Sequence, residues 1–216
     1  MKKNSFSIIW DWNGTIVDDA FVFIKIMNSF LKERNLPLIS LKDYQRFFVF
    51  PVKNYYISLG FDFTKESFET LSYEFIAEYK KAMFSPVLVN GVSSLISALN
   101  KEKITQAIVS AQENSLLKKA VNYYKLNKNF VCVQGTDNYK AMGKIDIAQK
   151  VFSAHFKGSK KTILIGDTKH DAEVAKALCL DCCLVSYGHS SKERLEKTGF
   201  PVVGSVSELQ TILFDY

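Results

Sequence analysis

The sequence predicts an α/β fold built on a doubly wound parallel sheet, with a helical domain inserted near its N-terminus. Short apolar runs alternate with helix-length amphipathic segments along most of the 216 residues, and this is the pattern of repeated strand–helix units. The alternation is interrupted once, between residues 19 and 85, where only helical patterns occur. Together these observations indicate a Rossmann-like core that carries an inserted α-helical domain.

The core is expected to begin with the apolar run at residues 6–10. Later strands are expected at residues 104–111, 130–136, 161–168, 181–188 and 201–206. Runs that are apolar throughout are typical of parallel strands buried on both faces. Amphipathic segments predict helices at residues 92–103, 114–127, 144–157, 171–180 and 191–199. Residues 110–113 and 168–171 also match the capping box that starts many helices.

The stretch between residues 19 and 85 predicts four helices, at residues 19–36, 40–50, 52–60 and 67–84. Pro37, Pro51 and Pro86 follow the first, second and fourth of these segments, and proline is a strong helix-stop signal. The expected domains are therefore a discontinuous core, residues 1–18 and 86–216, and a helical insert, residues 19–85. The many Phe and Tyr residues of the insert are expected to fill a helical bundle.

Composition favours a small-molecule enzyme over a nucleic-acid or membrane protein. Apolar residues make up 47% and charged residues 23% of the chain, and the net charge is +6. The positive charge is spread along the chain, without the dense basic patch of nucleic-acid binders, and a mildly positive field favours anionic substrates. No run resembles a signal peptide or a membrane span, so a cytoplasmic location is expected.

Polar residues follow the expected strands where the strands end. Asp11 ends the first strand, Ser110 the second and Asp167 the fourth; Lys144 follows the third, and Asp171 lies one helical turn after Asp167. Ligands of open parallel sheets bind at this edge. Neighbouring carboxylates need a cation, and oxygen ligands suit Mg²⁺, which also takes phosphate oxygens. Asp11 is then a carboxylate able to attack phosphorus.

Four short motifs resemble those of the haloacid dehalogenase-like hydrolase superfamily. They are DWNGT at residues 11–15, VSA at 109–111, GK at 143–144 and GDTKHD at 166–171. The insert resembles the helical cap of the phosphoglycolate phosphatase branch. The resemblance implies a Mg²⁺-dependent phosphatase that hydrolyses small phosphomonoesters, such as phosphoglycolate or a sugar phosphate, through an aspartyl phosphate on Asp11. It implies a small phosphorylated metabolite as partner and leaves the oligomeric state open.

The resemblance also implies roles for the matched residues. Asp11 is implied to be both nucleophile and metal ligand. The backbone carbonyl of Asn13 is implied to be a second metal ligand, and Asp167 and Asp171 are implied to complete the Mg²⁺ site. The phosphoryl group is implied to be bound by Ser110, by Lys144 and by the backbone N–H groups of Trp12, Asn13 and Ala111.

Asn13 departs from the motif, because phosphatases of this family carry an aspartate there as general acid and base. An amide cannot shuttle a proton, and loss of such a group typically slows a reaction about 10²–10⁴-fold. Four explanations stay open: a phosphatase in which another group suffices, an engineered substitution, a non-catalytic phosphate-binding protein, or a chemistry that needs no acid there. The last includes cleavage of a C–P bond, as in phosphonoacetaldehyde hydrolases, with Lys53 forming a Schiff base.

Lys53, His170 and His189 are further candidates. Lys53 lies in a segment, residues 50–56, that resembles the substrate-contacting loop of the family's cap. It is expected either to contact an acidic tail of the substrate or to be a solvated lysine at a helix start. His170 and His189 follow strand ends, and their roles stay open.

Overall fold

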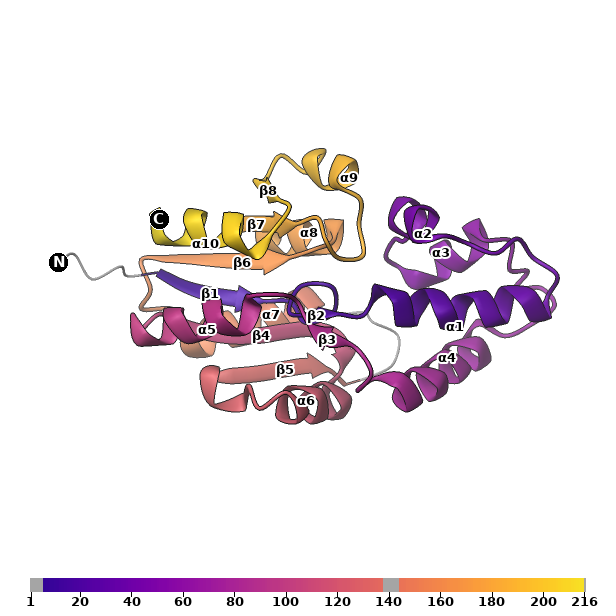
Figure 1. Cartoon of the computed structure of the whole chain (residues 1–216), viewed down its shortest axis with the longest axis horizontal. Coiled ribbons are helices and arrows are strands. Elements are labelled where there is room, and N and C mark those ends of the chain that lie inside the picture. The colour runs from indigo at the N-terminus through magenta and orange to yellow at the C-terminus, as the bar shows by residue number, and fades with distance from the viewer. Residues whose placement is uncertain (1–5, 138–143, 216) are drawn as a thin grey trace.

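The computed structural model describes residues 6–137 and 144–215 of the chain (Figure 1). Its centre is a six-stranded parallel sheet in the order β5-β4-β1-β6-β7-β8. The strands are β1 (Phe6–Trp10), β4 (Thr105–Glu113), β5 (Cys132–Thr136), β6 (Lys161–Gly166), β7 (Asp181–Val185) and β8 (Val202–Val203). Later strands extend the sheet on both sides of β1, so the predicted doubly wound fold is confirmed.

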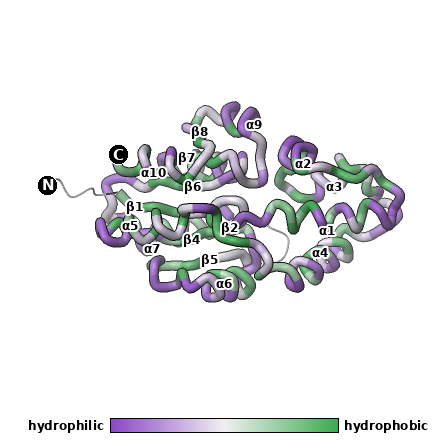
Figure 2. The backbone as a smooth tube through the Cα atoms, in the orientation of Figure 1, coloured by the Kyte–Doolittle hydropathy of each residue, from purple (hydrophilic) through white to green (hydrophobic). Residues whose placement is uncertain are grey.

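Helices cover both faces of the sheet (Figure 1). The core helices are α5 (Val92–Lys101), α6 (Asn114–Tyr123), α7 (Lys144–His155), α8 (Lys169–Ala177), α9 (Lys192–Glu196) and α10 (Val206–Asp215), and a 3₁₀ turn spans Asn127–Asn129. Ile8 and Trp10 of β1 pack into the hydrophobic cluster under α5, α6 and α10, and Ile9 packs into the cluster under α7 and α8. Figure 2 shows the apolar strands between amphipathic helices. Burial on both faces explains why the strands read as unbroken apolar runs.

The insert contains the four expected helices, and they lie beyond the carboxyl ends of the strands (Figure 1). They are α1 (Ala20–Glu33), α2 (Leu41–Phe47), α3 (Val52–Ser58) and α4 (Phe68–Ala82). The chain enters and leaves the insert through a short antiparallel pair that was not predicted, β2 (Val17–Asp18) and β3 (Val87–Leu88). None of the helices in residues 6–137 and 144–215 has the length and apolar character needed to cross a membrane.

Helix α2 of the insert is hydrogen-bonded to α9 of the core and to the segment that leads into it from β7. Nη1 of Arg194 donates to the carbonyl oxygens of Gln45, at 2.9 Å, and Phe48, at 2.7 Å. The side-chain amide of Gln45 donates in return to the carbonyl of Gly188 at 2.7 Å. These contacts hold the insert against the edge of the sheet where the strands end.

Two predicted elements differ from the structure. The capping box at residues 110–113 was wrong, because Ser110 lies inside β4 and Glu113 is the N-cap of α6, accepting from the backbone N–H of Ser115 at 2.9 Å. The strand expected at residues 201–206 is only two residues long, and the chain instead forms helix α10 from Val206, which was not among the predicted helices. The capping box at residues 168–171 is confirmed.

Candidate active site

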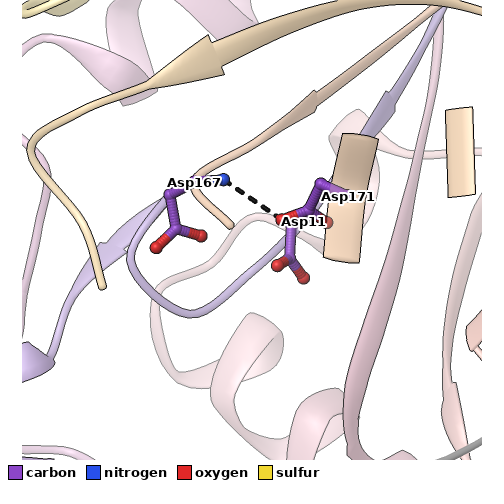
Figure 3. Close-up of side chains that lie close together, drawn as sticks. All are labelled: Asp11, Asp167 and Asp171. Carbon is purple, nitrogen blue, oxygen red and sulfur yellow. Dashed lines mark hydrogen bonds between the residues drawn. The ribbon is translucent and has the colours of Figure 1, made fainter. Parts of the chain in front are cut away.

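Three buried aspartates meet at the carboxyl edge of the sheet (Figure 3). Asp11 follows β1, Asp167 follows β6, and Asp171 lies in the first turn of α8. One carboxylate oxygen of each lies within 4.8 Å of the others. The neighbouring strands β1 and β6 are in register, with Trp10 paired to Ile165. The acids that follow these strands are therefore brought side by side.

Lys144 lies among these acids as the first residue of α7. Its side-chain Nζ is 2.9 Å from Oδ1 of Asp11 and 2.5 Å from Oδ1 of Asp171, and the residue is 2% exposed. Burial opposes the lysine's charge, but the two carboxylates outweigh it and raise the pKa of Lys144 above its usual range. The ammonium therefore stays charged and neutralises part of the acidic cluster.

The charge of the cluster is still unbalanced. Burial, together with the charges of Asp171 and Asp167, raises the pKa of Asp11 to about 7 although Lys144 opposes the shift. Burial and the charge of Asp171 likewise raise the pKa of Asp167 to about 6, against the opposing charge of His189. An oxygen-only donor set with excess negative charge fits Mg²⁺, so the residues present match the metal that the sequence implied.

The carboxylates differ in how fully they are hydrogen-bonded. Oδ2 of Asp171 accepts from the backbone N–H of Thr168 at 2.9 Å and from its hydroxyl at 2.6 Å, while Oδ1 accepts from Lys144. These bonds outweigh burial and lower the pKa of Asp171. Both oxygens of Asp171 are thus occupied, which suits it to hold the lysine and the loop. Asp167 also accepts at both oxygens, from the Thr15 hydroxyl at 3.1 Å and from the His189 N–H at 2.6 Å. Among the described residues only Oδ1 of Asp11 is bound, which leaves Oδ2 of Asp11 available to a ligand.

Gly14 is required by the turn that carries Asp11. Its φ of +70° lies in the left-handed region, and a Cβ there would come within 2.3 Å of both Oδ2 of Asp167 and Cδ2 of His189. Glycine has no Cβ and adopts this φ without strain. The glycine of the first motif therefore permits Asp11 and Asp167 to approach each other.

Ser110 and Ala111 lie where the pairing of β4 with β5 becomes irregular, between Val109 and Glu113. Such irregularities often re-aim side chains beside active sites. The Ser110 hydroxyl accepts from the backbone N–H of Gln112 at 3.1 Å, and the serine is 1% exposed. Ser110 and Ala111 line the same cavity as Asp11 and Lys144.

Trp12 contributes to this site through its backbone. Its N–H donates to Oδ1 of Asp11 at 2.8 Å, while its ring is buried and packs against Tyr124 with the ring centroids 5.9 Å apart. The Trp12 N–H therefore fixes the orientation of the Asp11 carboxylate.

The side chain of Asn13 is bound to a residue that sequence reasoning missed. Its amide Nδ2 donates to Oδ2 of Asp19 at 2.5 Å and to the hydroxyl of Tyr79 at 2.9 Å. Asp19 is fully buried and also accepts from the backbone N–H of Gly14 at 3.0 Å. A carboxylate is thus present beside the first motif, six residues after Asn13.

His189 completes this network from the segment after β7. One ring nitrogen, Nε2, lies 3.2 Å from Oδ1 of Asp19, and the other, Nδ1, lies 2.7 Å from the Tyr44 hydroxyl. Burial alone would lower the pKa of His189, but the hydrogen bond to Asp19 and the charges of Asp167, Asp19 and Asp11 raise it to about 9. At neutral pH an imidazolium therefore faces Asp19, and the network ties the motif turn to the insert and to the core.

One signal in the sequence points to Asp19. The helical pattern places Asp19 at the start of the first insert helix, where acids commonly act as caps. It does stand at the N-cap position of α1, but its side chain caps nothing and points to Asn13 instead. Two consecutive acids, Asp18 and Asp19, directly after a motif that lacks its second acid are the feature that could have identified it.

The structure does not bring Lys53 to the site. Its side chain is exposed, and its Nζ lies 5.6 Å from the ring centroid of Phe63 and 5.8 Å from that of Phe68. Lys53 is absent from the described residues that line the cavity, whereas His170 and His189 do line it. Gly143 of the third motif lies outside the described residues.

A cavity extends from the acids into the insert. Its empty volume is about 1150 Å³, the open mouth included. Asp11, Asn13, Ser110 and Lys144 lie at its core end. The insert end is lined by aromatic side chains, here called the aromatic wall: Phe23, Phe48, Phe50, Phe68, Phe75 and Tyr79, with further tyrosines beside them.

Several solved structures share this fold. A predicted phosphatase from Clostridium acetobutylicum superposes with a TM-score of 0.81 at 22% identity, covering 99% of both chains. A predicted phosphoglycolate phosphatase from Haemophilus somnus gives 0.77 at 14% identity, again over 99% of both chains. At these identities the likeness shows the fold alone.

Sequence comparison gives the family. The tyrosine-protein kinase PtkA of Mycobacterium tuberculosis is 22% identical over 214 aligned positions, which cover 95% of this chain and 72% of that protein. The family described as haloacid dehalogenase-like hydrolase matches residues 8–185. That match runs from Ile8, within β1, to the end of β7, and it includes the insert and every acid of the site. The chain therefore belongs to the haloacid dehalogenase-like hydrolase family.

Proposed function

We propose that this protein is a Mg²⁺-dependent hydrolase of small phosphomonoesters that works through an aspartyl phosphate on Asp11. The observation that supports the proposal best is the convergence of Asp11, Asp167, Asp171 and Lys144. Of these, Asp11 and Lys144 line the cavity. Carboxylates beside a lysine at a strand edge suit the transfer of a phosphoryl group to a carboxylate nucleophile.

Asp11 attacks with the oxygen that the protein leaves available. The N–H of Trp12 and Nζ of Lys144 both bind Oδ1, so Oδ2 forms the new bond to phosphorus. The bond between phosphorus and the ester oxygen breaks, and the electron pair leaves with that oxygen. Water then hydrolyses the aspartyl phosphate, which returns the carboxylate and releases inorganic phosphate.

The remaining residues hold the phosphoryl group and the metal. Ser110, Lys144 and the backbone N–H groups of Asn13 and Ala111 are the proposed phosphate ligands, since all four residues line the cavity. Mg²⁺ would be held by Asp11, Asp167 and the backbone carbonyl of Asn13, with Asp171 supporting, and would shield the charge repulsion between Asp11 and the phosphoryl oxygens. Lys144 supplies a fixed positive charge for the same purpose.

The insert, residues 19–85, is proposed to act as a cap over this site. The hydrogen bonds from Arg194 to α2 hold it closed, and closure excludes water from the reacting groups. Cleavage of a C–P bond through Lys53 has no support, because that ammonium lies against Phe63 and Phe68. The phosphate-binding protein without turnover is the alternative that the experiment must separate.

Hydrolysis of phenyl phosphate and acetyl phosphate tests the proposal directly. With Mg²⁺ the protein should release phosphate, EDTA should abolish the activity, and Asp11→Asn should reduce kcat by about 10³-fold or more. The exposed neighbour variant Asp18→Asn serves as control and should keep the activity. Mass spectrometry should find a phosphoryl group on the peptide that contains Asp11.

Two outcomes would contradict the proposal. Tight binding of phosphate esters with no turnover of either compound would favour the binding protein. Transfer of phosphate from ATP to a tyrosine peptide, without hydrolysis of small esters, would favour the kind of reaction that the name of the PtkA relative describes.

A further inference from the structure

The cavity has a lining that suits a flat apolar group. Within the aromatic wall, Phe23 packs against Phe75 with ring centroids 5.4 Å apart and against Tyr79 at 5.2 Å. Across the mouth, Phe50 lies against the ring of His170 at 5.0 Å. Aromatic side chains bind other aromatic rings through stacked and edge contacts worth more than their area alone.

Four buried polar atoms among the lining residues have no hydrogen-bond partner within the part of the chain that the structure describes. They are the Tyr55 hydroxyl, Nε2 and Oε1 of Gln112, and Nε2 of His170. Tyr55 itself is 1% exposed. Leaving such groups unpaired is costly, and natural proteins rarely do so without a reason. Three residues of one cavity therefore offer hydrogen bonds that a ligand can complete.

The same lining is unsuited to an acidic substrate. Lys144 is the one lysine or arginine among the described lining residues, and it is already bound to Asp11 and Asp171. Glu113 also lines the cavity and would repel a carboxylate. A phosphorylated acid such as phosphoglycolate would find no uncommitted lysine or arginine for its carboxylate among the described lining residues, and burying a carboxylate without a cation is unfavourable.

Asn13 independently restricts the leaving group. Its amide nitrogen donates to Asp19 and Tyr79, and it cannot protonate the departing oxygen. An oxygen attached directly to an aromatic ring leaves as a phenolate and needs this help least, because a phenol such as tyrosine has a pKa of about 10, far below that of an alkyl alcohol.

We propose, resting on the phosphatase function above, that the substrates are aryl phosphomonoesters whose ring carries hydrogen-bonding groups. The ring lies against the aromatic wall, and its polar groups pair with Gln112, Tyr55 and His170. Asp11 takes the phosphoryl group, the bond between phosphorus and the ring oxygen breaks, and the phenolate takes its proton from water. The cavity and the missing acid thus select the same class of ester.

Binding of phosphonates to the full chain with Mg²⁺ tests the ring specificity without turnover. Benzylphosphonate has a methylene in place of the ester oxygen of phenyl phosphate, and calorimetry should show it binding about tenfold or more tighter than methylphosphonate or phosphonoacetate. A para-carboxamide group on the ring of benzylphosphonate should raise its affinity about three- to tenfold further. Equal affinity for methylphosphonate, or tighter binding of phosphonoacetate, overturns the proposal.

Two conservative variants test the polar contacts. Gln112→Met and Tyr55→Phe should each reduce the gain from the carboxamide while leaving the affinity for plain benzylphosphonate unchanged, which also shows that the variant is folded. Phe75→Leu should reduce the affinity for benzylphosphonate about three- to tenfold and leave the affinity for methylphosphonate unchanged. If the carboxamide still raises the affinity by the same factor in both Gln112→Met and Tyr55→Phe, the assigned contacts are contradicted.

These results separate the inference from the function on which it rests. Turnover of sugar phosphates or phosphoglycolate, with no preference for aryl phosphonates in binding, would keep the phosphatase and reject the aryl substrate. Absence of turnover for every ester would reject the phosphatase, whatever the binding preference.

Discussion

Asn13 is the residue that most restricts which esters the proposed phosphatase can hydrolyse. The amide does not simply replace a carboxylate: it donates a hydrogen bond to Asp19, which also pairs with His189. The negative charge missing at position 13 is therefore present one contact further away, behind the amide, on a residue that is not among the described residues lining the cavity. This arrangement keeps the first motif ordered without giving it a proton donor.

Asn13→Asp should restore a general acid at that position. The new carboxyl group would lie beside the Asp19 carboxylate, and a neighbouring negative charge favours the protonated form of the new acid. We expect kcat for benzyl phosphate, an alkyl ester, to rise about 10–100-fold, with a smaller change for phenyl phosphate. The activity gained should fall at alkaline pH as the new acid loses its proton.

Steady-state kinetics on both esters across pH measures this effect. Asn13→Ala is the matched control, because it removes the amide without supplying a proton. An unchanged rate ratio for benzyl and phenyl phosphate in Asn13→Asp would show that another group already protonates the leaving oxygen.

At the scale of elements, the contact between α2 and the segment after β7 decides how the insert is held. Arg194 donates to two carbonyls at the carboxyl end of α2, Gln45 returns a hydrogen bond, and Tyr44 of the same helix meets His189. Carbonyls at a helix end lack partners within the helix and bind cations well. One arginine thus holds a helix of the insert over the site.

Arg194→Ala should loosen the insert without unfolding the core. Loss of two charge-assisted hydrogen bonds costs about 1–3 kcal/mol, and we expect faster hydrogen exchange in residues 41–48 together with a raised KM. Arg46→Ala on α2, where the exposed guanidinium lies over Phe47, is the control and should leave both unchanged. Exchange that stays slow in Arg194→Ala would show that aromatic packing alone holds α2.

At the scale of the whole molecule, folding stability is coupled to pH through the buried acids. The pKa values of Asp11, about 7, and Asp167, about 6, are raised above the usual value, and that of His189 is raised to about 9. A group whose pKa is raised on folding stabilises the protein at low pH, and this stabilisation is lost as pH rises through the folded value. The metal-free protein should therefore lose stability from about pH 4 to 9, first as Asp11 and Asp167 ionise and then as His189 loses its proton.

Mg²⁺ should reverse this trend, because it binds the ionised carboxylates and releases their protons. The rise in Tm on adding Mg²⁺ should be larger at about pH 8 than at about pH 5.5, as thermal unfolding with EDTA or Mg²⁺ can measure. In the double variant Asp11→Asn/Asp167→Asn, the rise in Tm on adding Mg²⁺ should no longer differ between the two pH values. An equal rise at both pH values would mean that these acids are already ionised without metal.

The fold and the acidic cluster were accessible from sequence because each depends on local patterns. Apolar runs mark buried strands, and the acids follow those runs directly, so parallel pairing brings Asp11 and Asp167 together. The contact between Asp19 and His189 joins residues 170 positions apart, and no local pattern specifies it. The direction of Lys53 and the exposed faces of the aromatic rings depend on how the helices pack, which composition does not encode.

The two-residue strands β2 and β3 allow the insert to change in evolution independently of the core. Both crossings between insert and core lie side by side, Val17 opposite Leu88, so the helices can be lengthened, replaced or redesigned while the sheet beneath stays intact. In the proposed phosphatase, changes in the insert can thus alter which ester is accepted while Asp11, Asp167 and Lys144 stay in the core. A lineage that exchanged residues 20–85 would keep these core residues and Asp19, and would change the surface that the substrate meets.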